Sequence, residues 1–259
     1  MATKIISFSG KGGVGKSTLL VLMLKYIIES KKFENILVID ADPDANIGDL
    51  IGEEIHFKQT IGGRMTEIKE RIQKQMVSLD VPKNQVIEAE FYETLIEMDD
   101  FDLIEMGRGE GEGCYCSVNN TLKHVIDIIA TNYDIVLIDA PAGLEYFARK
   151  TGQDVSDLII VTDASKMGFH TMERIVEITN EVQLDFKNIL ILGNRFPDDM
   201  QTLLEERVKK ITDKKVHFLG ALPYNEEVSK INLTGENLLD LAKENELYNS
   251  AKDLFSEVI

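Results

Sequence analysis

A glycine-rich segment near the start of the chain carries the residue types that bind a polyphosphate. It follows an apolar run and reads Gly10-Lys11-Gly12-Gly13-Val14-Gly15-Lys16-Ser17-Thr18. Glycines let successive backbone N–H groups turn toward phosphate oxygens, which then lie at the positive end of the following helix. Lys16 is expected to neutralise the β- and γ-phosphates of a nucleotide, and Ser17 to hold Mg²⁺. The predicted nucleotide-binding residues of this segment are Gly12, Gly13, Val14, Gly15, Lys16, Ser17 and Thr18.

The lysine at position 11 is not required by the general phosphate-binding motif. Loops that carry it, as GKGGVGKST does here, resemble those of the deviant Walker A ATPases, which include nitrogenase iron protein, the cell-division-site ATPase and plasmid-partition ATPases. The resemblance implies an ATP-controlled homodimer in which Lys11 reaches the nucleotide of the partner chain. The alternative is a chance match that binds no nucleotide, but every motif position is filled and the flanking runs have the required type.

Two further segments resemble parts of the same family. Residues 36–46 resemble its switch I segment; by position, Asp42 would orient or activate the attacking water and Asp40 would support the Mg²⁺ shell. Asp139 ends the apolar run 135–138 and looks like the Walker B acid, with residues 140–144 resembling switch II. Isolated aspartates often only cap helices or turns. Three strand-end motifs in the family's order favour catalysis, with Lys11, Lys16 and Asp42 as the expected catalytic residues.

Later in the chain, Asn194, Arg195 and Pro223 fall where this family contacts the nucleotide base. Asn194 is the candidate for the adenine edge, and the Pro223 loop is expected beside it. A strand-end asparagine is as often a turn residue. Both interpretations therefore remain open from the sequence.

The only two cysteines of the chain, Cys114 and Cys116, stand one residue apart in the glycine-rich stretch 106–117. Such a pair can be inert, redox-active or metal-binding. A disulfide is disfavoured because so short a spacing closes a strained ring. A helix expected over 117–130 would lower the pKa of both thiols. Two thiolates are too few for a closed site, whereas a symmetric dimer supplies four soft ligands of the kind that bind Zn²⁺ or Ni²⁺.

The segments MGRGEGEGCYC and DAPAGLEYFARKT narrow the resemblance. Together with the phosphate loop they resemble the CooC-type nickel-insertion ATPases of carbon monoxide dehydrogenase maturation, which are close to the acetyl-CoA synthase accessory ATPase. The resemblance covers nearly the whole chain. It implies a dimeric ATPase that binds Ni²⁺ at the shared cysteines and delivers it to apo carbon monoxide dehydrogenase or acetyl-CoA synthase.

Two other functions are alternatives to this one. An iron–sulfur electron-transfer ATPase like nitrogenase iron protein fits the ligand count, although those proteins draw their cysteines from two separated segments. A spatial regulator on a membrane or on DNA is disfavoured by the net charge of −17 and by the acidic polar face of residues 237–259. Neither a nucleic-acid nor a membrane partner is expected. The start of the chain shows no signal peptide, so a cytoplasmic protein is expected.

These residues need a scaffold that brings strand ends together. Apolar runs predict strands over 4–9, 35–39, 102–105, 134–139, 158–162, 188–192 and 216–219. Helical patterns separate most of them, which predicts an α/β fold with a doubly wound, mainly parallel sheet and its ligands at the carboxyl ends of the strands. The resemblance of the phosphate loop implies that this fold is a P-loop NTPase with a deviant Walker A motif. Helical patterns also occur near 65–75, 85–95 and 237–259. One domain spanning 1–259 is expected, because no linker divides the chain.

Overall fold

The computed structural model describes residues 3–43, 46–73, 93–107, 129–141, 156–181 and 186–259. Within these residues the chain forms one sheet of eight strands in the order β3-β4-β2-β5-β1-β6-β7-β8. All neighbouring strands are parallel except β3 and β4. The strands are β1 (Lys4–Gly10), β2 (Ile36–Asp40), β3 (Ile96–Glu97), β4 (Asp102–Glu105), β5 (Ile135–Asp139), β6 (Asp157–Thr162), β7 (Asn188–Gly193) and β8 (Val216–Ala221).

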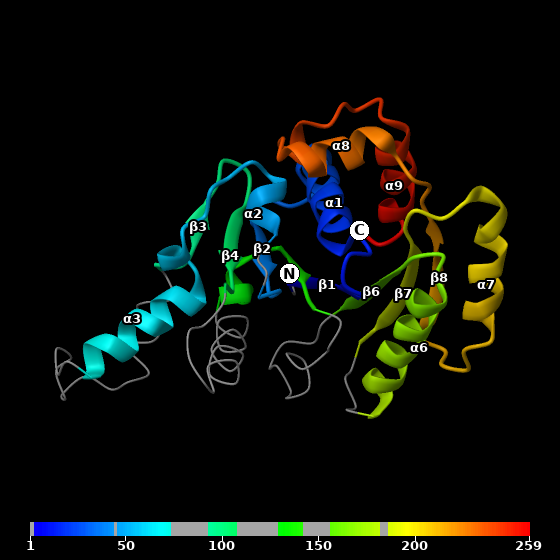
Figure 1. Ribbon diagram of the computed structural model, residues 1–259, viewed down its shortest axis with the longest axis horizontal. Helices are drawn as coiled ribbons and strands as arrows, with labels where there is room; N and C mark the ends of the chain where they lie inside the picture. The colour runs from blue at the N-terminus through cyan, green and yellow to red at the C-terminus, as the bar shows by residue number, and fades with distance from the viewer. Residues whose placement is uncertain (1–2, 44–45, 74–92, 108–128, 142–155, 182–185) are drawn as a thin grey trace.

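Helices cover both faces of the sheet (Figure 1). One buried cluster joins alternate strand residues to α1 (Lys16–Ser30), α8 (Glu226–Thr234) and α9 (Glu246–Ser256). The other joins the remaining strand residues to α6 (Lys166–Glu181) and α7 (Gln201–Lys209). Strands buried on both faces are apolar without alternation, as parallel sheets require. This confirms the predicted doubly wound, mainly parallel α/β fold.

Short elements complete the described chain. Next to the sheet edge formed by β3 and β4 lie α2 (Ile47–Leu50), the 3-10 turn η1 (Phe57–Gln59) and α3 (Ile61–Gln73). Three further 3-10 turns are η2 (Ala130–Asn132), η3 (Asp198–Met200) and η4 (Leu238–Asp240). The predicted strands agree with the observed ones to within two residues at either end, and β3 was not predicted.

The C-terminal helix predicted over 237–259 is wrong in its first half. Residues 238–240 form η4, and α9 begins only at Glu246. Asparagines cause both starts, because the Asn237 side chain accepts a hydrogen bond from Leu239 N and the Asn245 side chain accepts one from Tyr248 N. Apolar spacing alone does not register these caps.

The other helix predictions also changed at their boundaries. The helix expected near 65–75 begins four residues earlier, at Ile61. The helix expected near 85–95 does not reach its predicted end, because residues 93–95 are not helical and β3 follows them. Its remainder, and most of the helix expected over 117–130, lie outside the described residues.

Candidate nucleotide site

The phosphate loop joins β1 to α1 at the centre of the sheet. Gly13 and Gly15 have φ values of +76° and +94°, which L side chains rarely adopt. Gly15 precedes the first residue of α1 and has no side chain to cap it, so the first N–H groups of a 15-residue helix face the loop. The predicted loop therefore forms an anion cradle at a helix N-terminus.

Lys16 and Asp42 meet beside this cradle. Lys16 is only 6% exposed, and its Nζ lies 4.0 Å from Asp42 Oδ2. A buried ammonium next to the helix N-terminus suits a phosphate. The structure thus brings two of the predicted catalytic residues, from β1–α1 and from the end of β2, to one place.

Asp139, at the end of β5, presents an oxygen that suits a metal ion. Its side chain is fully buried, Ser17 Oγ donates to Oδ2, and Oδ1 has no hydrogen-bond partner within the described part of the chain. Burial raises the pKa of Asp139 to about 6, against the hydrogen bond from Ser17. An unpartnered buried carboxylate oxygen beside a serine hydroxyl matches the hard oxygen ligands that Mg²⁺ prefers.

Asp40, which was expected to support the Mg²⁺ shell, binds backbone N–H groups in this structure. It is fully buried, and its carboxylate accepts hydrogen bonds from the backbone N of Asp42 at 3.0 Å, Asn46 at 2.8 Å and Ile47 at 3.0 Å. Burial, and then the charge of Asp139, raise the pKa of Asp40 well above its usual range. In this structure Asp40 anchors the backbone of the segment that carries Asp42.

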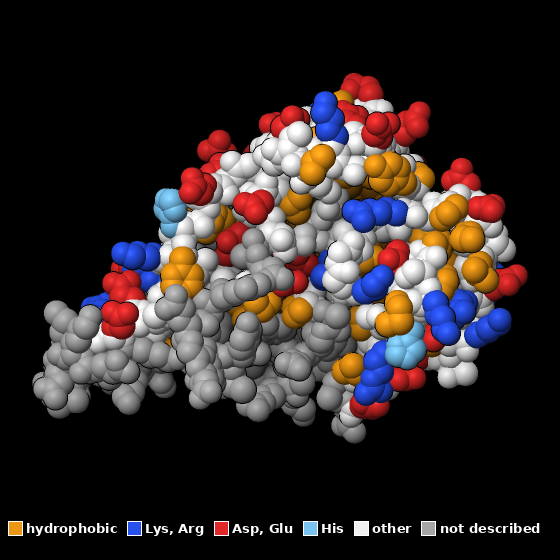
Figure 2. Space-filling model, in the orientation of Figure 1, with side chains coloured by type: hydrophobic (Ala, Val, Ile, Leu, Met, Phe, Trp, Pro, Cys, Tyr) orange, Lys and Arg blue, Asp and Glu red, His pale blue; other side chains and the backbone are white. Residues whose placement is uncertain are grey.

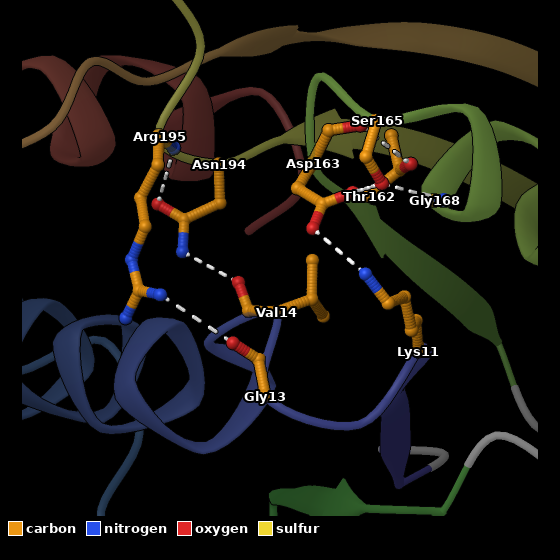
Figure 3. Close-up of polar contacts among 9 residues, drawn as sticks. All are labelled: Lys11, Gly13, Val14, Thr162, Asp163, Ser165, Gly168, Asn194 and Arg195. Atoms are coloured by element: carbon orange, nitrogen blue, oxygen red, sulfur yellow. Dashed lines mark hydrogen bonds and ion pairs between the residues drawn. The ribbon is translucent and has the colours of Figure 1, made fainter.

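Lys11 is held within its own chain. Its Nζ lies 3.2 Å from Asp163 Oδ2, in the loop that follows β6 (Figure 3). Ser165 Oγ donates to the other oxygen of Asp163 at 2.5 Å. Burial raises the pKa of Asp163, but the hydrogen bonds from Ser165 and Lys11 outweigh it and leave the pKa below its usual value. Action of Lys11 on a partner chain, which stays a prediction, would require it to leave Asp163.

The predicted base-contacting residues gather on the other side of the loop. Asn194 Nδ2 donates to Val14 O at 2.8 Å, and Arg195 donates to Gly13 O at 3.4 Å (Figure 3). Asn194 is 5% exposed, so in this state it supports the phosphate loop. Asn194, Arg195 and Pro223 line one small cleft with Thr18 of α1. The contact with adenine stays a prediction.

Two acids in this region were missed by sequence reasoning, Asp163 and Glu105. Asp163 directly follows the apolar strand DLIIVT and Glu105 ends the strand DLIE, which is the same signal that identified Asp139. Glu105 is 3% exposed, and its pKa is raised, chiefly by burial. A search for every acid at a strand end would have found both.

Cys114, Cys116 and residues 142–144 lie outside the described residues. Among the residues that are described, there is no group of three or more His, Cys, Asp or Glu placed to hold a metal ion.

The described helices include none long and apolar enough to cross a membrane. Figure 2 shows acidic side chains over the C-terminal elements at the top of the view, and Lys and Arg over α6 and α7.

Comparisons with known proteins agree with this geometry. A family described as an AAA domain matches residues 3–192. An uncharacterized ATP-binding protein of Methanocaldococcus jannaschii is 38% identical, with 98% of each chain covered. The carbon monoxide dehydrogenase accessory protein CooC of Rhodospirillum rubrum is 27% identical, over 92% of this chain and 90% of that protein. A crystal structure of a ParA family ATPase from Chlorobium tepidum superimposes with a TM-score of 0.70 at 17% identity, covering 98% of this chain and 99% of that one. The chain thus belongs to this AAA-domain family, and it is an ATP-binding P-loop ATPase.

Proposed function

We propose that this ATPase is a nickel-insertion accessory protein. Two chains would hold Ni²⁺ between them through Cys114 and Cys116, and ATP would control delivery to apo carbon monoxide dehydrogenase or acetyl-CoA synthase. Zn²⁺ is expected to bind the same thiolates at least as readily. The similarity to CooC over most of both chains supports an accessory role.

The observation that carries the proposal concerns the stretch 106–117, which contains both cysteines and begins directly after β4. β4 lies beside β2, with Glu105 in register with Asp40. The next residue, Met106, donates from its backbone N to Asp40 O at 2.8 Å, and its carbonyl accepts from Gly62 N at 2.8 Å. The stretch thus starts at the backbone of an aspartate in the nucleotide site. We take this described start of the stretch, at Met106, as the connection through which ATP would influence the cysteines.

ATP hydrolysis follows from the residues around the phosphate loop. Lys16 and the N–H groups of α1 would hold the phosphates, and Ser17 with Asp139 would hold Mg²⁺, which neutralises charge on the transferred phosphoryl group. Asp42 would orient the attacking water and accept its proton. Lys11 would exchange Asp163 for the partner's phosphates when two ATP-bound chains meet.

Metal stoichiometry tests the proposal. The Cys114→Ser/Cys116→Ser protein and a Lys16→Ala protein would be titrated anaerobically with Ni²⁺ and, separately, with ATP. The cysteine variant should lose Ni²⁺ and keep ATP, and the Lys16 variant should weaken ATP binding and keep Ni²⁺. The parent should bind one Ni²⁺ per two chains and shift toward dimers as it does so.

Three results would contradict the proposal. The first is half-stoichiometric nickel binding by the double cysteine variant, and the second is one nickel per chain in the parent. The third is iron with inorganic sulfide in anaerobically purified protein, which would favour the iron–sulfur alternative.

A further inference from the structure

Glu105 is a buried carboxylate that the hydrolysis scheme above does not use. It ends β4 and lies next to Asp40 in the sheet. Its Oε1 accepts a hydrogen bond from the backbone N of Gly48 at 3.0 Å, in the first turn of α2. A charged group this well buried is costly unless its hydrogen bonds are made. The amide of Gly48 is therefore a specific partner and not an incidental contact.

Position 48 is shaped around this contact. A Cβ atom added to Gly48 would lie 2.9 Å from Glu105 Oε1 and 2.9 Å from Ile55 Cδ1. A larger residue would have to displace the carboxylate or the Ile55 side chain. The absence of a side chain at Gly48 thus leaves room for the Glu105 carboxylate, although the two residues are 57 apart in the sequence.

The same carboxylate continues an anchor that Asp40 begins. Asp40 accepts from the backbone N of Asn46 and Ile47, and Glu105 accepts from the next amide, that of Gly48. Asp40 also accepts from Asp42 N. Asp40 therefore holds the backbone N of Asp42. Asp40 and Glu105 together hold the backbone amides of residues 46–48 at the start of α2.

Glu105 is itself held firmly at this place. The backbone groups of the following residue, Met106, bond to Asp40 on one side and to Gly62 on the other. Because the backbone next to Glu105 is held in this way, its carboxylate offers the Gly48 N–H an acceptor at a fixed position.

We propose that Glu105 is a positioning residue for ATP hydrolysis. By holding the Gly48 amide it fixes α2 next to Asp40, and Asp40 in turn holds the backbone N of Asp42 beside Lys16. The inference rests on the role proposed for Asp42. If a group that orients the attacking water is displaced by about 1 Å, kcat should fall more than the affinity for ATP.

Steady-state ATPase kinetics of the full-length protein with Mg²⁺-ATP test this inference. Four variants are needed: Glu105→Ala, Glu105→Gln, Asp102→Ala and Asp42→Ala. Glutamine keeps an oxygen that can accept from Gly48 N. Asp102 is the matched control, because it is a carboxylate on the same strand that accepts a hydrogen bond from Tyr133 at 2.5 Å, away from the nucleotide.

Glu105→Ala should lower kcat about tenfold or more while the affinity for a non-hydrolysable ATP analogue changes less than about twofold. Glu105→Gln should restore kcat to within about threefold of the parent, and Asp102→Ala should leave it unchanged. This split between turnover and binding, with rescue by glutamine, is not what general destabilisation produces.

The remaining results would each overturn a defined claim. Parental kcat in Glu105→Ala, an equal loss in Asp102→Ala, or a loss in Glu105→Gln as large as in Glu105→Ala would overturn the role of Glu105. A fall in analogue affinity as large as the fall in kcat would do the same. Parental kcat in Asp42→Ala would instead overturn the role proposed for Asp42.

Discussion

Removing the charge of Asp163 should strengthen the ATP-dependent dimerisation that we propose. In the single chain Lys11 is paired with Asp163 at 3.2 Å, and a lysine that reaches the partner's phosphates must first give up this pair. The substitution Asp163→Asn removes the charge and keeps an oxygen that can accept from Ser165 Oγ. The helix start at α6 should therefore stay intact.

The structure sets the size of the effect. The two side chains are 37% and 29% exposed, so each ion pair contributes about 0.5 to 1 kcal/mol. A dimer breaks two such pairs, and the saving of about 1 to 2 kcal/mol corresponds to a dissociation constant lower by about 5- to 30-fold. The difference should shrink at high ionic strength, because the pair is partly exposed to solvent.

Sedimentation velocity with a non-hydrolysable ATP analogue measures the dissociation constant directly. Glu173→Gln is the matched control, since it removes one acid from α6 that forms a 3.0 Å ion pair with Arg207 at similar exposure. It should leave dimerisation unchanged. An Asp163→Asn protein that dimerises no more tightly than the parent would refute the reasoning, and so would an equal gain in the control.

The remaining predictions concern hydrolysis, pH and stability. Lys16→Ala should weaken nucleotide binding, whereas Asp42→Ala should keep ATP and lose about 100-fold or more in turnover, as isothermal titration and phosphate release would show. The pKa of Asp139 is raised to about 6, so the folded chain holds a proton that the unfolded chain loses near pH 4. The free energy of unfolding of the ligand-free protein should therefore fall as the pH rises from about 4 to 6. Asp139→Asn should flatten that dependence in denaturant titrations. Tyr248→Phe removes the 2.9 Å hydrogen bond to Glu29 and should cost about 1 kcal/mol in the free energy of unfolding, with no change in ATP turnover.

Some of the predictions that failed show which local signals were overlooked. The spacing of apolar residues over 237–259 suits one long helix, yet Asn237 and Asn245 each accept a backbone N–H and start separate elements. Lys25 adds a tertiary reason, because its Nζ donates to Leu239 O at 2.5 Å and so ties η4 to α1. A cap is visible in the sequence, but its effect depends on what the chain packs against.

The phosphate loop, Asp139 at the end of its strand and the parallel sheet could all be predicted from the sequence. These are local properties: glycines that reach positive φ, β-branched runs buried on both faces, and a helix that starts where the glycines stop. Each can be predicted because one short segment contains everything that produces it.

Which strand ends become neighbours depends on the assembled sheet. Lys11 meets Asp163 across 152 residues, and Glu105 meets Gly48 across 57, because β6 lies beside β1 and β4 beside β2. Strand order depends on how the helices pack over both faces, and hydrophobic periodicity does not encode it. The same acid at a strand end can therefore hold a metal ion, a lysine or a backbone amide, according to the strand that becomes its neighbour.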